Sequence, residues 1–142
     1  MKFFKMLCFA LAILPLFTAA RAADLAGRWT AEFDSQIGVQ KYVYEFKIDG
    51  EKITGKATHD HSMGKGEAEL KAIKLSGDDV SFTEPLNING DEITITYTGK
   101  IAGDEMKLTR QVGDFATEQI VVKRAAAGTP STPQKPKSSD EK

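Results

Sequence analysis

The chain has almost no cysteine, and this absence excludes several kinds of site. Of its 142 residues one is a cysteine, Cys8, which lies close to the N-terminus. A single thiol cannot form an intramolecular disulfide, and the region after Cys8 offers no cysteine nucleophile and no thiolate metal ligand. The stability of the fold must therefore come from a hydrophobic core.

The chain also lacks an excess of charge of one sign. It has 19 basic and 20 acidic residues, or 16 against 20 when Lys2, Lys5 and Arg21 near the N-terminus are set aside. The remaining net charge, 16 minus 20 or −4, does not provide the basic surface that attracts nucleic acids or anionic membranes. We therefore expect no nucleic-acid partner.

A hydrophobic run long enough to span a membrane is missing near the N-terminus. The apolar stretch at 6–17 has 12 residues, whereas a transmembrane helix needs about 20. Two lysines precede this stretch, and residues 20–22 (Ala-Arg-Ala) follow it with the small-x-small pattern of a cleavage site. These features predict a signal peptide at 1–22, a mature chain from Ala23, and a periplasmic or secreted protein that is not inserted in the membrane.

The C-terminal segment lacks large apolar residues. Residues 125–142 contain three prolines together with serine, threonine and lysine. Such a segment cannot bury enough apolar surface to offset the entropy lost on ordering. We predict a disordered tail at 125–142 and a single folded domain at 23–124.

Between these two ends, apolar and polar residues alternate with a period of two, which is typical of β-strands. The alternation is clearest at 29–33, 42–48, 80–83, 93–98 and 106–109. No stretch has the apolar stripe of an amphipathic helix. The domain is therefore predicted to be all-β.

Glycines mark the turns between these strands, at positions 50, 64, 77, 90 and 103. Asp49-Gly50 and Asn89-Gly90 are strong hairpin signals, because tight turns need positive φ angles. The spacing predicts about eight strands, near 28–34, 39–49, 52–59, 66–75, 79–88, 92–101, 105–111 and 116–123. We predict an eight-stranded antiparallel up-and-down meander that closes as a small barrel, because closure removes exposed sheet edges. The interior of such a barrel has room for side chains or one small ligand.

The start of the first strand, Gly27-Arg28-Trp29, resembles the Gly-x-Trp pattern of lipocalins and calycins. The resemblance implies a lipocalin-like barrel in which the tryptophan plugs one end and a basic residue of the last strand packs across it. Arg124 is in phase with the apolar residues of the last strand and would take that role. The stretches at 29–34, 36–42 and 112–118 are similar to a group of small exported bacterial proteins, some of them described as endo-xylanases or glycoside hydrolases.

Several polar residues share the phase of the apolar face and should point into the barrel. They are Tyr42, Tyr44, His59, His61, Glu84, Tyr97, Arg110 and Glu118. Buried charges must be paired or serve a site. In a structural interpretation, Glu84 and Arg110 form an ion pair, or bulges at the strand ends turn them to solvent. In a functional interpretation, the three tyrosines and Arg110 line the barrel mouth and bind a sugar or a small carboxylate.

The sequence His59-Asp60-His61 raises the question of a metal site, because residues i and i+2 of a strand share a face. A third ligand would have to come from Glu67 or Glu84. Histidines beside a glycine-rich turn, here residues 62–66, are more often exposed to solvent. We therefore predict no metal and no cofactor.

Three functions are compatible with these features. The first is an exported, monomeric, lipocalin-like protein that binds a small molecule or a carbohydrate such as a sugar. The second is a small glycoside hydrolase of the endo-xylanase type, with Glu84 and Glu118 as its catalytic residues. That chemistry needs two carboxyl groups about 5 Å apart, or about 6.5–9.5 Å apart for inversion. The third is a passive envelope protein whose barrel is filled and takes no ligand.

Overall fold

The structure is a computed structural model and describes residues 24–125. The predicted signal peptide at 1–22 and residues 126–142 of the predicted tail lie outside the described residues. Within the described range, no helix is long and apolar enough to cross a membrane.

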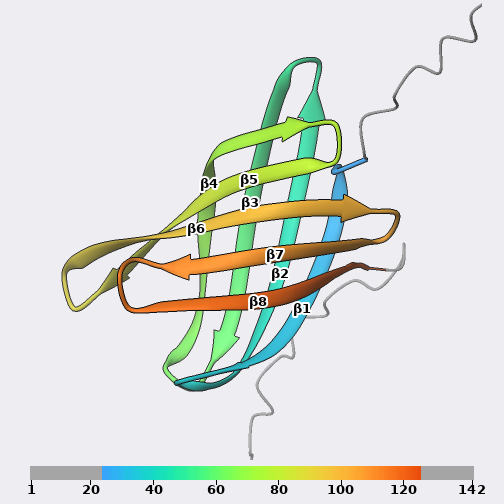
Figure 1. Ribbon diagram of the computed structural model, residues 1–142. Helices are drawn as coiled ribbons and strands as arrows, with labels where there is room; N and C mark the ends of the chain where they lie inside the picture. The colour runs from blue at the N-terminus through green and yellow to red at the C-terminus, as the bar shows by residue number, and fades with distance from the viewer. Residues whose placement is uncertain (1–23, 126–142) are drawn as a thin grey trace, which may run out of the picture.

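The described residues form eight β-strands (Figure 1). Each strand pairs antiparallel with its neighbours in sequence, and β8 pairs back with β1, so the sheet is a closed up-and-down barrel. This confirms the predicted fold class. The strands are β1 (Gly27–Ser35), β2 (Gly38–Asp49), β3 (Lys52–His61), β4 (Gly64–Ser76), β5 (Asp79–Ile88), β6 (Asp91–Ala102), β7 (Glu105–Val112) and β8 (Ala116–Arg124).

The turn between β5 and β6 shows why glycine marks the hairpins. Asn89 and Gly90 have φ angles of 55° and 95°, and two successive positive φ angles match the right-handed twist of the flanking strands. The Gly90 N–H also donates to Asn87 Oδ1 at 3.1 Å. The hairpins β1–β2, β3–β4, β5–β6 and β7–β8 all turn at one end of the barrel, which we call the hairpin end.

The alternation predicted for the fourth strand is interrupted in β4. Its pairing with β5 shifts register between Lys71 and Lys74, and Ala72 has a positive φ of 50°. This bulge adds one residue to β4. Leu70 and Leu75 can therefore both contact the core, although a regular strand would point residues five positions apart to opposite faces.

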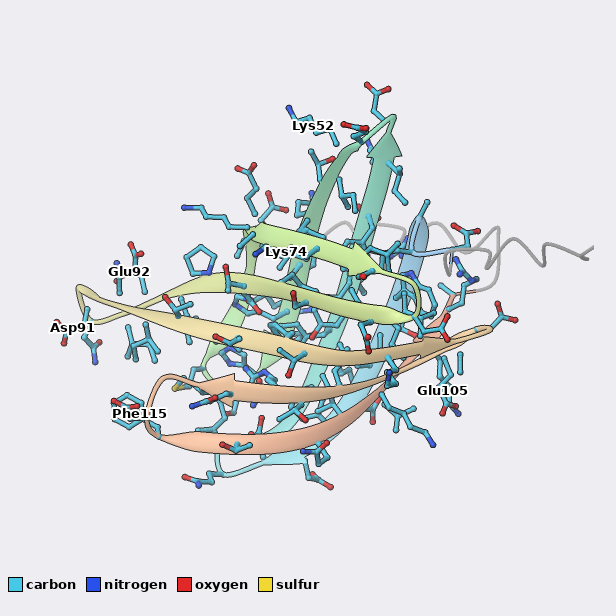
Figure 2. All side chains as sticks on the ribbon, turned by 45° about the horizontal axis from the view of Figure 1, so that its top comes forward. Lys52, Lys74, Asp91, Glu92, Glu105 and Phe115 are labelled. Atoms are coloured by element: carbon cyan, nitrogen blue, oxygen red, sulfur yellow. The ribbon has the colours of Figure 1, made fainter. Side chains whose placement is uncertain are left out.

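Aromatic side chains fill much of the barrel interior. The largest that are fully buried are Trp29, Tyr44, Phe82 and Tyr97. Phe82 stacks on Tyr97 with 4.6 Å between ring centroids, and Tyr44 meets both rings edge-on. Figure 2 shows Phe115, at the tip of the β7–β8 hairpin, pointing away from the barrel, and its side chain is 74% exposed.

Trp29 closes the end of the barrel opposite the hairpin end, which we call the Trp29 end. Its indole N–H donates to the Leu25 carbonyl at 2.9 Å. The Arg124 guanidinium carbon lies 4.2 Å from the centroid of the Trp29 ring, and the two residues are opposite each other in the pairing of β1 with β8. The predicted contact between Arg124 and Trp29 and the predicted pairing of the first and last strands are both confirmed.

The strands that close the barrel are paired over a short stretch. The register of β1 and β8 consists of Trp29↔Arg124 and Thr30↔Lys123, whereas β1 pairs with β2 over its whole length. Beyond Thr30 the two strands diverge toward the hairpin end (Figure 1). The pairing that closes the barrel therefore lies at the Trp29 end.

Candidate functional site

The polar residues predicted to point inward meet on the hairpin side of the barrel. Strand pairing sets Tyr42 opposite His59, and Arg110 opposite both Tyr97 and Glu118. Together with two further buried residues of β2 and β5, these side chains form what we call the Glu84 cluster. Its members are Tyr42, Tyr44, His59, Glu84, Tyr97, Arg110 and Glu118.

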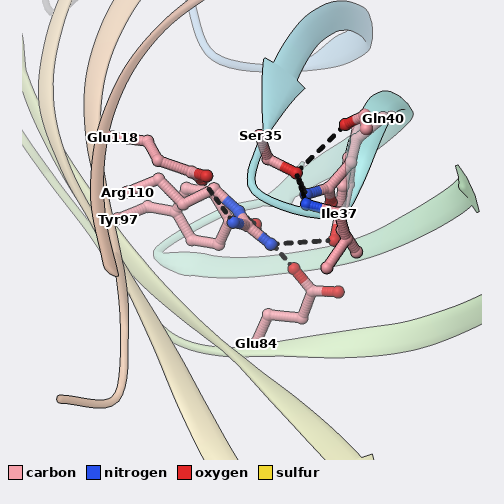
Figure 3. Close-up of polar contacts among 9 residues, drawn as sticks. Ser35, Ile37, Gln40, Glu84, Tyr97, Arg110 and Glu118 are labelled. Carbon is pink, nitrogen blue, oxygen red and sulfur yellow. Dashed lines mark hydrogen bonds and ion pairs between the residues drawn. The ribbon is translucent and has the colours of Figure 1, made fainter. Parts of the chain in front are cut away.

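Arg110 is the centre of this cluster (Figure 3). Its guanidinium donates through Nη1 to Glu118 Oε2 at 2.6 Å, through Nη2 to the Tyr42 hydroxyl at 3.2 Å and through Nε to the Tyr97 hydroxyl at 3.2 Å. Burial opposes the charge of Arg110, but the surrounding Tyr97, Tyr42 and Glu118 oxygens hold its pKa above the usual range. All three nitrogens of the guanidinium are therefore engaged within the protein.

Glu84 is fully buried, with 0% of its surface exposed. The Tyr97 hydroxyl donates to Glu84 Oε2 at 2.7 Å, whereas Oε1 has no hydrogen-bond partner among the described residues. Figure 3 shows the same asymmetry, since only one oxygen of this carboxyl group carries a dashed line. Burial raises the pKa of Glu84, and the Tyr97 hydrogen bond and the Arg110 charge only partly oppose that shift.

His59 lies beside the unpartnered oxygen of Glu84. Its Nδ1 is 3.8 Å from Glu84 Oε1, beyond hydrogen-bond distance, and it has no hydrogen-bond partner among the described residues. Gly66 makes room for the ring, because a Cβ at that position would lie 2.7 Å from His59 Nε2. Burial lowers the pKa of His59, and the nearby His61 and Arg110 lower it further. These effects disfavour the protonated imidazole beside a buried carboxyl group.

Aromatic rings form one wall of the cluster. Tyr42 stacks between Phe33 and Tyr44, with ring centroids 5.9 Å and 5.5 Å apart. The Arg110 guanidinium lies over the Phe33 and Tyr42 rings, at 5.5 Å and 5.4 Å from their centroids. The Tyr44 hydroxyl makes no hydrogen bond of good geometry among residues 24–125, although the Tyr97 hydroxyl is near enough to oppose part of the pKa shift. Burial still raises the pKa of Tyr44 well above its usual value.

Two side chains connect the buried cluster with the surface. The side chain of Glu118 is 17% exposed and that of His59 is 13% exposed. Glu118 belongs to β8 and His59 to β3, whereas Arg110 on β7 is buried.

The tips of two hairpins are tied together beside the cluster. The Ser62 hydroxyl donates to the Ile37 carbonyl at 2.7 Å, which links the β3–β4 turn to the β1–β2 turn. Behind this link, the buried Gln40 donates through Nε2 to Ser35 Oγ at 2.6 Å (Figure 3). These bonds fix the β1–β2 hairpin, which carries Tyr42 on its second strand.

The inward orientation predicted for Tyr42, Tyr44, Glu84, Tyr97 and Arg110 is confirmed by their burial, and Glu118 is largely buried as well. The predicted Glu84–Arg110 ion pair is wrong. Arg110 pairs instead with Glu118, because the β7–β8 register sets those two residues opposite each other. The alternative in which strand-end bulges turn Glu84 and Arg110 to solvent is also wrong.

Sequence reasoning considered His59 as a metal ligand and did not include it among the ligand-binding residues. Glu67 cannot join it, because Glu67 is exposed on the outer face of β4 and pairs with Lys56 at 3.2 Å. Among residues 24–125, no group of three or more histidines, cysteines or carboxylates could hold a metal ion. The inward phase of His59 after Ala57 was predicted, and the further signal that could have added His59 to the ligand-binding residues is the small Gly66 opposite it.

The Glu84 cluster therefore brings two carboxyl groups, one guanidinium, one imidazole and three phenols together in the barrel interior. Comparison of the chain with protein-family models, with curated proteins and with solved structures gives no match. The argument for function therefore rests on the cluster itself.

Proposed function

We propose that the protein is an exported, monomeric, lipocalin-like barrel that binds a small hydroxyl-bearing ligand, such as a sugar, at the Glu84 cluster. One observation carries the proposal. Three buried polar atoms, Tyr44 Oη, His59 Nδ1 and Glu84 Oε1, have no hydrogen-bond partner among the described residues. Hydroxyl groups both donate and accept hydrogen bonds, so a polyol could satisfy all three.

The same atoms argue against a passive envelope protein. A buried polar group without a partner costs about 1–3 kcal/mol of stability, and three such groups lie together here. A barrel that had only to be stable would gain by replacing them with apolar side chains. Their presence favours a site that a ligand completes.

The contacts of Arg110 narrow the ligand class that the sequence left open. A small carboxylate would need guanidinium donors, but these already bind Glu118, Tyr42 and Tyr97. The unpartnered atoms are two potential acceptors and one hydroxyl. A neutral hydroxylated ligand therefore fits the free groups better than a carboxylate does.

The glycoside hydrolase alternative has weaker support. Glu118 is bound to Arg110 at 2.6 Å, so its carboxyl group is not free to act on a glycosidic bond. The two groups are also separated by Arg110 and Tyr97 in the hydrogen-bond network. A polysaccharide chain would have to displace this network before both carboxyl groups could act on it.

The binding proposal is tested with the purified protein, a panel of monosaccharides and polyols, and isothermal titration calorimetry. Tyr44→Phe removes one unpartnered hydroxyl while keeping the ring, so the variant should fold normally and bind a panel ligand about tenfold more weakly. Thr58→Ala, on the exposed outer face of β3, is the matched control and should bind normally. If no panel member binds, or if Tyr44→Phe binds as the wild type does, the proposed site is wrong.

The proposed export is tested separately. A reporter fused to residues 1–30 should leave the cytoplasm, and mass spectrometry of the exported full-length protein should find an N-terminus at or near Ala23. A mature protein that retains Cys8 would contradict the assignment of a cleaved signal peptide.

A further inference from the structure

The Glu84 cluster has one more carboxyl group than it has permanent cations. Glu84 and Glu118 are its carboxyl groups, and Arg110 is its guanidinium. Because Arg110 contacts Glu118 at 2.6 Å, Glu84 keeps only the neutral Tyr97 hydroxyl as a hydrogen-bond partner. A buried carboxylate needs either a compensating positive charge or a proton.

We propose that the ligand carries an ammonium group, which binds between Glu84 Oε1, His59 Nδ1 and the Tyr44 hydroxyl. The inference rests on the proposed function and narrows it to amines, such as amino sugars. A primary ammonium has three N–H donors and no acceptor. The three unpartnered atoms offer it a carboxylate oxygen, an imidazole lone pair and a hydroxyl oxygen.

The distance between two of these atoms suits a bridging nitrogen. His59 Nδ1 and Glu84 Oε1 are 3.8 Å apart, too far for a direct hydrogen bond. A nitrogen about 2.9 Å from each, the usual N–H···O distance, closes a triangle on that separation. The pair is thus spaced to bind one donor atom in common.

The charges around Glu84 favour a cation over an anion. A bound anion would add a third negative charge to a site whose one guanidinium is already engaged, whereas an ammonium would balance Glu84. The titratable and charged groups of the cluster around Glu84 are Tyr42 and Tyr44 on β2, His59 on β3, Tyr97 on β6, Arg110 on β7 and Glu118 on β8. Asp60 and His61 on β3 act on the neighbouring His59. Of these, Asp60 is occupied by Lys65 at 3.0 Å.

His59 is poorly suited to supply the missing charge. Its protonation is opposed by burial, by His61 stacked at 4.9 Å and by Arg110, which together lower its pKa. Without a ligand, the charge of Glu84 is removed most readily by a proton on Glu84 itself, whose pKa is raised by burial. An ammonium ligand would replace that proton, so binding below the pKa of Glu84 should release one proton.

The inference is tested by calorimetry with matched pairs of probes, glucosamine against glucose and propylamine against propanol. The amine should bind at least about tenfold more tightly than the alcohol, because hydrogen bonds between charged groups are about twice as strong as neutral ones. Titrations at acidic pH in two buffers of different ionisation enthalpy should show proton release on amine binding, one proton from Glu84 where it is protonated and one from His59 where its ring is protonated.

Three variants separate this inference from a general loss of folding. Glu84→Gln keeps the shape of the side chain and should lower amine affinity at least about tenfold, a larger loss than the one it causes in alcohol affinity. His59→Ala, at a partly exposed position, should weaken the amine severalfold. Glu69→Gln on the exposed face of β4 is the matched control and should change nothing.

The outcomes distinguish the two proposals. Equal affinity for glucose and glucosamine would overturn the ammonium inference and leave the proposed binding function standing. Binding of neither would overturn both. Competition by potassium or sodium chloride that disappears in Glu84→Gln, without amine selectivity, would assign the free carboxyl group to a metal cation and overturn the amine.

Discussion

The two ends of the barrel treat their polar groups in opposite ways. At the Trp29 end, the Arg124 guanidinium stacks on the indole and donates to Asp104 Oδ1, the Ala26 carbonyl and the Asp24 carbonyl at 3.0, 2.8 and 2.6 Å. At the hairpin end, the Arg110 guanidinium is equally engaged, but three buried polar atoms around it have no partner. The guanidinium at the Trp29 end is thus satisfied by the protein, whereas the hairpin end contains buried polar atoms that lack hydrogen-bond partners among the described residues.

This difference separates stability from function within one small sheet. The pairing that closes β1 against β8 lies at the Trp29 end, so that end holds the barrel together. The hairpin end is held by the tight turns of individual hairpins and can carry unpartnered groups without opening the sheet. The comparison predicts that removing a side chain whose polar groups are fully paired, at either end, lowers stability. Substitution of Glu84, which has an unpartnered oxygen, should not lower stability at pH 7 and should change binding.

The largest expected effect is that of Trp29→Ala. Removing a fully buried indole should lower the free energy of unfolding by about 3–5 kcal/mol, a large part of the stability of a small domain. Chemical denaturation followed by circular dichroism measures the loss, or shows that the variant does not fold. Phe115→Ala, at the exposed β7–β8 tip, is the control and should stay within about 0.5 kcal/mol of wild type. Similar losses in both variants would contradict the role given to Trp29.

Arg110→Met should have the next largest effect, about 3 kcal/mol. The variant leaves the Glu118 carboxylate without its guanidinium and takes a donor from the Tyr42 and Tyr97 hydroxyls. Adding Glu118→Leu should restore part of the lost stability, because the double variant no longer contains an unbalanced carboxylate at that position. A double variant less stable than Arg110→Met alone would mean that Glu118 has a second structural partner.

Most of the fold could be predicted from the sequence because two local signals agree. Alternation of apolar residues identified the strands, and the glycines identified the turns, including Asn89-Gly90 with its two positive φ angles. The β4 bulge at Ala72 was missed, although Leu70, Ile73 and Leu75 already carry the signal. All three contact the core, which a strand of strict period two does not allow.

The candidate site was predicted less completely, because its contacts depend on register. The alternation of inward and outward residues along each strand was enough to predict that Glu84, Arg110 and Glu118 point inward. It could not identify the partner of Arg110, because that depends on which residue of the neighbouring strand lies opposite it. The turn at 113–115 sets Glu118 there; a shift of one residue would place Thr117 opposite Arg110 and turn every side chain of β8 to the other face. The unpartnered Glu84 Oε1 follows from that pairing.

A smaller effect is expected for Arg124→Met. The variant keeps the aliphatic stem but loses the cation–π contact with Trp29 and the hydrogen bonds to the chain before β1, at a cost of about 1–2 kcal/mol. Lys123→Met, on the exposed face of β8, should be nearly neutral. Thermal denaturation of the two variants checks the difference. Equal melting temperatures would show that Trp29 alone closes the barrel.

The smallest effect, and the one with the opposite sign, is expected for Glu84→Gln. Because burial raises the pKa of Glu84 in the folded state, the protonated form is favoured on folding. The stability that this carboxyl group contributes is fully present below its unfolded pKa and is lost as the pH rises through its folded pKa. Glutamine has the shape of the protonated acid at every pH and can still accept the Tyr97 hydrogen bond.

Glu84→Gln should therefore be more stable than wild type at pH 7, by about 1 kcal/mol, and the advantage should vanish as the pH falls below 4.5, the ordinary value for this carboxyl group. His59 titrates in the opposite sense, because its lowered pKa removes stability as the pH falls, but it is present in both proteins and largely cancels in the comparison. Urea denaturation at pH 4, 5, 6 and 7 measures the difference, with Glu69→Gln as the exposed control. A variant less stable than wild type at pH 7 would mean that the Glu84 carboxylate already has a compensating charge. The two ends of the barrel would then not differ in whether their buried polar groups have partners.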